Sequence, residues 1–172
     1  WLKQLQVFGI FAAGYLAPEH RAYLDGIIAD LTAWGLKDHF EYRGEVDRAQ
    51  KIEYLRSLDV LSVPATYEEP KGIFLLEAMA CATPVVATPQ AVSALTAQPG
   101  KAVLVAQDPQ AFADAVIDLL GNPSKQREIG QAGRHYVETH HRWDDIARRL
   151  EAIYAEVLAE RIAPPQLRYS VA

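Results

Sequence analysis

Residues 67–87 constrain the fold more than any other stretch, because a turn, a helix and a strand follow one another there without a linker. Gly72 permits a tight turn, and the apolar run that begins at Ile73 predicts a helix to about Cys81. The run Val85–Ala87 then reads as a buried strand. A strand reached so directly from a helix is typical of a domain in which helices cover a parallel sheet.

The same alternation extends along most of the chain. Apolar segments predict strands, and residues with helical spacing between capping residues predict helices. The expected strands are 5–12, 40–43, 60–63, 85–87 and 102–105. The expected helices open at Pro18, Asp47, Ile73 and Asp108-Pro109, and two more cover about 125–138 and 143–161. This order predicts an α/β fold with a doubly wound parallel sheet and three layers, α/β/α.

Length and composition favour one soluble domain. We expect a single domain over 1–162, with a tail at 163–172 after Pro164-Pro165. The formal charge of −5 argues against nucleic acid as a partner. The single cysteine, Cys81, excludes an internal disulfide and fits a reducing, cytoplasmic location. No apolar run approaches the ~20 residues of a membrane span. Because the chain begins at Trp1, we expect a domain truncated at its N-terminus.

Two carboxylates flank the predicted start of the central helix. Glu69 and Glu77 are separated by seven residues that include Gly72. Amides at a helix N-terminus attract phosphate, whereas carboxylates accept hydrogen bonds from hydroxyls such as those of sugars and riboses. In parallel sheets, ligands bind beyond the carboxyl ends of the strands, where loops 44–47, 64–72 and 88–95 are expected. The middle loop therefore predicts a site for a nucleotide sugar.

The span 69–87 resembles the signature of retaining nucleotide-sugar glycosyltransferases that have two Rossmann-like domains, the GT-B fold. It is most similar to the bacterial group 1 family, also numbered family 4. Members typically read Glu-x-x-Gly-x-x-x-x-Glu-Ala-Met-Ala-x-Gly-x-Pro-Val-Val. Weaker similarity covers the flanks at 40–46, 58–64, 130–134 and 143–147. The resemblance spans about 5–158 and is to the C-terminal, Rossmann-like half of such an enzyme.

The resemblance implies the reaction and its partners. A nucleotide-sugar donor binds the C-terminal domain, a separate N-terminal domain binds the acceptor, and a glycosyl group passes to an acceptor hydroxyl with retention. It implies no cofactor and no essential metal. The family's diphosphate-binding Arg and Lys would lie before Trp1, so we expect the isolated chain to be inactive. Any peripheral membrane contact would come through the missing domain.

The resemblance also assigns roles to residues of the signature. Glu69 would contact the donor sugar hydroxyls and is the candidate catalytic residue. Glu77 would accept hydrogen bonds from the ribose diol. Gly72, Ile73 and Phe74 would offer backbone N–H groups to the sugar or the phosphate. The alternatives are a solvated loop acid at Glu69, an exposed helix residue at Glu77 and an ordinary turn glycine at Gly72.

Three further residues carry less specific assignments. Lys71 either reaches a phosphate or is solvated, and relatives often have an aromatic residue there. Val46 and Lys51 match positions that flank the base in some relatives, although a buried strand-end valine and a solvent-facing helix lysine are equally reasonable. Ala82 stands where relatives usually have glycine, and loop 89–95 lacks the family's glycine-rich Pro-Glu sequence.

Other functions are weighed against this interpretation. A non-catalytic Rossmann-like binding or interaction module, docked to a separate acceptor domain, is the main alternative. A phosphorylase or epimerase of similar shape is disfavoured, because such enzymes do not usually continue the motif in this way. His135, His140 and His141 match no zinc spacing. The chain contains neither Gly-x-Gly-x-x-Gly after its first strand nor a P-loop, which disfavours nicotinamide and P-loop chemistry.

Overall fold

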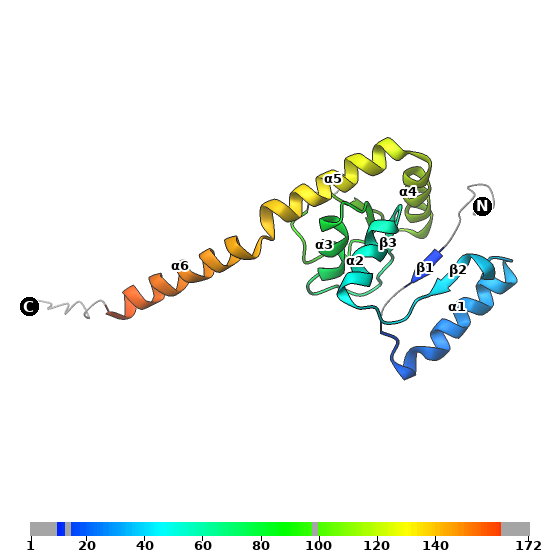
Figure 1. Cartoon of the computed structure of the whole chain (residues 1–172), viewed down its shortest axis with the longest axis horizontal. Helices are drawn as coiled ribbons and strands as arrows, with labels where there is room; N and C mark the ends of the chain where they lie inside the picture. The colour runs from blue at the N-terminus through cyan, green and yellow to red at the C-terminus, as the bar shows by residue number, and fades with distance from the viewer. Residues whose placement is uncertain (1–9, 13–14, 98–99, 163–172) are drawn as a thin grey trace, which may run out of the picture.

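The structure is a computed structural model that describes residues 10–12, 15–97 and 100–162. Short strands alternate with helices, and the last helix extends away from the body (Figure 1). The strands are β1 (Ile10–Ala12), β2 (Phe40–Tyr42), β3 (Leu61–Val63), β4 (Val85–Ala87) and β5 (Leu104–Val105). The helices are α1 (Arg21–Ala33), α2 (Arg48–Ser57), α3 (Ile73–Ala80), α4 (Pro109–Gly121), α5 (Pro123–His140) and α6 (Trp143–Ile162). Two 3-10 turns, Pro18–His20 and Lys37–His39, precede α1 and β2.

All strand pairs in the described residues are parallel, as predicted. β1 pairs with β2, and β3, β4 and β5 form a second sheet in that order. Leu61 lies opposite Val85, and Val86 lies opposite Leu104. The α/β class is confirmed, but the expected single sheet is present as two separate parts. Sequence patterns identify strands without specifying which edges pair, so this division could not be predicted.

Capping residues set most helix ends where the sequence places them. Asp47 forms a capping box on α2, in which its carboxylate accepts a hydrogen bond from the backbone N–H of Gln50 at 2.8 Å. Asp108 accepts from the N–H of Ala111 at the start of α4. Gly35, at φ +70°, follows the end of α1. α5 begins two residues earlier than predicted, because Asn122 caps it with Pro123 in the first turn.

The core surrounds β4, whose three residues are fully buried. One face of the sheet packs against α3 and α5, and the other packs against α4 and the start of α5. The first face includes Leu75 and Met79 of α3, and the second includes Leu119 and Ile129. Burial on both faces explains why 85–87 reads as a continuous apolar run.

The amphipathic pattern of α6 does not lead to burial in this structure. Its apolar residues are between 38% and 82% exposed, and the helix extends away from the sheets (Figure 1). They are Trp143, Ile146, Leu150, Ile153, Tyr154, Val157 and Leu158. In the described part of the chain, no helix is both long and apolar enough to cross a membrane. Most of the first expected strand and the expected tail lie outside the described residues, and the single-domain boundaries stay a prediction.

A close contact fixes α5 against the turn between α3 and β4. A Cβ placed on Gly130 would lie 2.1 Å from the carbonyl oxygen of Ala82. Ala82 itself adopts a left-handed conformation with φ +60°. The turn thus holds a residue with a side chain in the left-handed region, at the cost of local backbone strain. Gly130 is required by this contact, because any side chain would meet backbone.

We expect Gly130→Ala to lower the free energy of unfolding by about 1–3 kcal/mol, because α5 must shift to relieve the overlap. Gly26→Ala is the matched control, since Gly26 lies within α1 and an added Cβ would meet nothing within 4 Å. The control should raise the free energy of unfolding by about 0.5–1 kcal/mol. Chemical denaturation measures the free energy of unfolding of both variants. The same change in Gly130→Ala as in Gly26→Ala would contradict the close packing of α5 against the turn at Ala82.

We expect Ala82→Gly to raise the free energy of unfolding by about 0.5–1 kcal/mol, because removing the left-handed strain outweighs the added freedom of the unfolded chain. Ala29→Gly in the exposed interior of α1 should instead lower it by about 0.5–1 kcal/mol. The same denaturation experiment compares the two. A loss of stability in both variants would show that Ala82 is unstrained.

Candidate functional site

The start of α3 is fixed by one carboxylate and one glycine. Glu69 Oε1 accepts hydrogen bonds from the backbone N–H of Gly72 at 3.2 Å and of Lys71 at 3.3 Å. Gly72 adopts φ +60°, and a Cβ there would lie 3.2 Å from Cδ2 of Leu95. Glu69 also donates its own N–H to the carbonyl of Gln90 at 3.1 Å. Glu69 is therefore a half-buried, hydrogen-bonded side chain and not a solvated loop acid.

Two backbone N–H groups remain available at this helix start. The N–H groups of Leu75 and Leu76 both bond to the carbonyl of Gly72, each at 3.1 Å. Within the described residues, no protein acceptor is recorded for the N–H groups of Ile73 and Phe74. Unpaired N–H groups in the first turn of a helix attract anions, through direct hydrogen bonding and the helix dipole. The geometry therefore suits a phosphate or another electron-rich oxygen.

Glu77 lies one turn into α3 and pairs with Lys51 of α2. Lys51 Nζ and Glu77 Oε1 are 2.7 Å apart, and both side chains are about one third to two fifths exposed (42% and 34%). The two predicted residues are thus in contact. The sequence predicts separate roles for the two residues and gives no direct sign of this contact. The available signal was that α2 and α3 both follow parallel strands and so begin at the same edge of the fold.

The Lys51–Glu77 pair borders a cavity of about 290 Å³ between α2 and α3. Arg48 and Arg56 also line it. Its remaining lining is mainly apolar, from Ile52, Leu55, Ala80 and Cys81. A cavity lined by both apolar and charged side chains can accept a flat group with polar edges. Glu69 is not among the residues that line this cavity.

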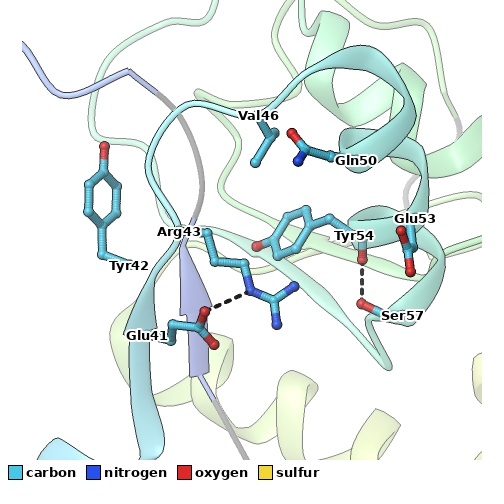
Figure 2. A pocket seen from close by; sticks show the side chains of 8 residues that line it. All are labelled: Glu41, Tyr42, Arg43, Val46, Gln50, Glu53, Tyr54 and Ser57. Carbon is cyan, nitrogen blue, oxygen red and sulfur yellow. Dashed lines mark hydrogen bonds and ion pairs between the residues drawn. The ribbon is translucent and has the colours of Figure 1, made fainter.

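Val46 and Lys71 occupy different surroundings from the pair. Val46 lines a larger cavity of about 660 Å³ between β2 and α2, shown in Figure 2. Lys71 is exposed, and its side chain has no recorded partner among the described residues. The structure therefore groups the predicted site residues into the α3 start, the Lys51–Glu77 pair, and Val46 beside the larger cavity. Their roles in binding or catalysis stay predictions.

The larger cavity is also lined by residues for which the sequence predicts no individual role. Arg43 of β2 and Tyr54 of α2 approach each other across it, with the guanidinium carbon 5.7 Å from the ring centre (Figure 2). Arg43 also contacts Glu41 at 3.3 Å. Burial raises the pKa of the Tyr54 hydroxyl above its usual value of 10.0, and the positive charge of Arg43 partly opposes this. Arg43 lies in the segment 40–46 that resembles the family, but the sequence predicts no individual role for it or for Tyr54.

Two of the three histidines considered above, His140 and His141, lie against Tyr136. His140 stacks on the Tyr136 ring at 4.9 Å between centroids, and His141 Nε2 lies 3.1 Å from the Tyr136 hydroxyl. Burial, and secondarily the neighbouring His140, lowers the pKa of His141. His135 is exposed. In the described ranges, no group of three or more His, Cys, Asp or Glu side chains is arranged to hold a metal ion.

Comparison with known proteins gives the family. Residues 7–136 match the family model for glycosyl transferases group 1. The chain belongs to this family. It is 35% identical over 127 residues to the phosphatidyl-myo-inositol mannosyltransferase of Mycobacterium leprae, covering 73% of this chain and 34% of that protein. The chain thus spans about a third of the length of this relative.

Solved structures agree on the fold. The sucrose-phosphate synthase of Thermosynechococcus elongatus superposes with a TM-score of 0.77 and 28% identity, over 91% of this chain and 41% of that one. The C-terminal domain of a group 1 glycosyl transferase from Francisella tularensis gives a TM-score of 0.75 at 22% identity, over 83% of this chain and 74% of that one. The predicted fold, resembling the C-terminal half of a GT-B glycosyltransferase, is confirmed.

We expect the Lys51–Glu77 pair to contribute little to stability, because both side chains are partly solvated. A double-mutant cycle with Lys51→Met and Glu77→Gln should give a coupling free energy below about 1 kcal/mol that falls as salt is added. Chemical denaturation of the four proteins of the cycle, at low and at high salt, measures this coupling free energy. A larger, salt-independent coupling would show that the pair exists chiefly to hold α2 against α3.

Proposed function

We propose that this chain is the donor-binding domain of a group 1 glycosyltransferase of family 4. The complete enzyme would move a glycosyl group from a nucleoside diphosphate sugar to an acceptor hydroxyl, with retention of configuration. The acceptor would bind a separate N-terminal domain of the longer protein. The family match supports glycosyl transfer in general. The arrangement at the start of α3 supports binding of a donor that carries both phosphate and hydroxyl groups.

The observation that carries this proposal is the pair of unpaired N–H groups at Ile73 and Phe74, next to the buried glycine turn. Glycosyl transfer builds negative charge on the departing diphosphate. Fixed N–H groups stabilise such charge without reorganising, and one well-placed donor is typically worth about 10²–10³ in rate. We propose that these two groups face the diphosphate and that Lys71 can approach it from the adjacent loop.

The carboxylates supply the remaining contacts in this proposal. Glu69 holds the loop through one carboxylate oxygen, and its other oxygen would accept a hydrogen bond from the donor sugar. Glu77 would accept hydrogen bonds from the ribose diol. Its contact with Lys51 would then be partly replaced by the contact with the ligand. Lys51 and Val46 would then flank the base. We propose that no cofactor or essential metal takes part, and that the reaction occurs in the cytoplasm.

A second candidate is a non-catalytic module that docks to an acceptor domain. The exposed apolar residues of α6 favour it, because a helix with such a face normally packs against another surface. The two candidates differ in what Glu69 and Glu77 do. A donor-binding domain loses ligand affinity when either is changed, whereas a docking module changes only in stability.

We expect Glu77→Gln to weaken binding of a nucleoside diphosphate sugar about 10–100-fold, because a hydrogen bond to a charged group is lost. Calorimetric titration should use a panel of GDP, UDP and ADP sugars, beginning with mannosyl donors because of the Mycobacterium leprae relative. Glu69→Gln should act in the same direction, since the amide oxygen can still hold Gly72 but accepts more weakly.

Glu68→Gln is the matched control. Glu68 is exposed, carries the same charge and lies next to Glu69. It should leave affinity within about twofold, because its charge acts through solvent. Denaturation of each variant separates a binding effect from a folding effect. Unchanged affinity in both Glu69→Gln and Glu77→Gln would contradict the donor-binding assignment and favour the docking module.

We expect the 172-residue chain alone to show no useful turnover. The proposal places the acceptor site, and the Arg and Lys that complete the diphosphate site, outside this chain. A radiolabelled-donor assay with lipid and sugar acceptors measures transfer directly. Rates within about tenfold of the typical ~10 s⁻¹ of enzymes would show that this domain suffices.

A further inference from the structure

The loop 88–95 lies against the loop that carries Glu69. The backbone N–H of Glu69 donates a hydrogen bond to the carbonyl of Gln90 at 3.1 Å. Leu95 packs beside Gly72, where an added Cβ would lie 3.2 Å from Cδ2 of Leu95. Both contacts reach residues that fix the start of α3. The loop 88–95 therefore supports the candidate site, although its sequence lacks the family's glycine-rich pattern.

This supporting loop is itself anchored at both ends. At its start, the backbone N–H of Thr88 donates to the carbonyl of Val63 at 3.2 Å, which continues the pairing of β4 with β3. A turn follows, closed by the N–H of Ala91 and the carbonyl of Thr88 at 3.1 Å, and Ala91 is fully buried. Just past the end of the loop, the N–H of Thr96 donates to the hydroxyl of Tyr136 in α5 at 3.2 Å. A loop held in this way can act as a support for its neighbour.

One side chain connects the two loops through a short hydrogen bond. The hydroxyl of Thr88, Oγ1, donates to the carbonyl of Ala65 at 2.7 Å, and both residues are half-buried. Ala65 follows the end of β3 and begins the stretch that leads to Glu69. The other side-chain bond recorded between the loops, within the described ranges, runs from Ser93 to the carbonyl of Glu69 and is 3.5 Å long at an exposed position. Thr88 therefore provides the stronger of the two links.

The hydroxyl of Thr88 restricts the path of the chain after β3. A β-branched side chain has few χ1 rotamers, so the direction of its hydroxyl is well defined. A half-buried carbonyl that loses its donor costs free energy, so Ala65 stays where Thr88 can reach it. Further along the same stretch, Glu69 is held by the carbonyl of Gln90 from the supporting loop. A site that is ordered before its ligand arrives binds more tightly, because less conformational entropy is lost on binding.

We propose that Thr88 is a positioning residue for the donor site. Its hydroxyl holds Ala65, and the loop 64–72 then presents Glu69 in the conformation that accepts a hydrogen bond from the donor sugar. This inference rests on the proposed function, because the nucleoside diphosphate sugar is the ligand that Glu69 would contact. The effect of Thr88 on Glu69 is a property of the free chain, and so it can be measured without any ligand.

The first test compares two substitutions at Thr88 by calorimetric titration with GDP, UDP and ADP sugars. Thr88→Val replaces the hydroxyl with a methyl group and leaves the carbonyl of Ala65 without this donor. We expect it to weaken donor binding about 3–10-fold, which is the range that one neutral hydrogen bond typically contributes. Thr88→Ser restores a hydroxyl at the same position, so it should bring the affinity back to within about twofold of the original chain.

Thr83→Val is the matched control. Thr83 is buried, and its Oγ1 also donates to a backbone carbonyl at 2.7 Å, that of Leu55 in α2. This bond joins α2 to the turn before β4 and does not involve the loop 64–72. Chemical denaturation should show that both valine variants lower the free energy of unfolding, whereas only Thr88→Val weakens donor binding. An equal loss of affinity in Thr83→Val would indicate a general loss of rigidity and would overturn the inference.

Hydrogen exchange followed by NMR tests the placement of Glu69 in the free chain. The reporters are the amides of Glu69, Lys71 and Gly72, which the recorded hydrogen bonds of this loop protect. Thr88→Val should speed their exchange about 3–10-fold, while Thr88→Ser and the control variant should not. If no donor binds the original chain, the proposed function fails and these amides alone decide the inference. Unchanged exchange, or unchanged affinity in Thr88→Val when the original chain binds a donor, would overturn it.

Discussion

The contact between the Glu69 carboxylate and the N–H groups of Lys71 and Gly72 is the constraint on which the site depends. It closes the loop that Gly72 turns through its left-handed conformation, and so makes α3 begin at Ile73. In the first turn that follows, no acceptor is recorded among the described residues for the N–H groups of Ile73 and Phe74. Glu77 then lies about 6 Å further along the helix axis, at 1.5 Å per residue. At that position it meets Lys51 from α2.

Packing behind α3 holds this arrangement in place. α3 is covered by α5, and Gly133 lets the helices approach so closely that a Cβ there would lie 3.2 Å from Met79 Cγ. Gly130 makes the corresponding contact with the turn at Ala82. β4, buried on both faces, connects this layer to the rest of the sheet. The site is thus a loop and a helix start on a rigid support, which is the usual way that α/β folds position ligands.

Local sequence signals predicted the elements well, because the forces behind them are local. Asp47 and Asp108 cap helices, and the apolar run at 85–87 becomes a buried strand. Features that depend on three-dimensional proximity could not be predicted in the same way. The Lys51–Glu77 contact, the capping role of Glu69 and the separation into two sheets all depend on which edges and ends meet. The pattern of α6 indicates an apolar face, but a pattern cannot name the surface that covers it.

The most direct measurement is a ¹H–¹⁵N NMR titration of the 172-residue chain with a nucleoside diphosphate and its sugar. We expect the amides of Ile73 and Phe74 to shift most and to gain protection from exchange. The amides of Lys71 and Gly72 should shift less, because Glu69 already holds them. Shifts confined to other surfaces, with Ile73 and Phe74 unchanged at saturating ligand, would contradict donor binding at the start of α3.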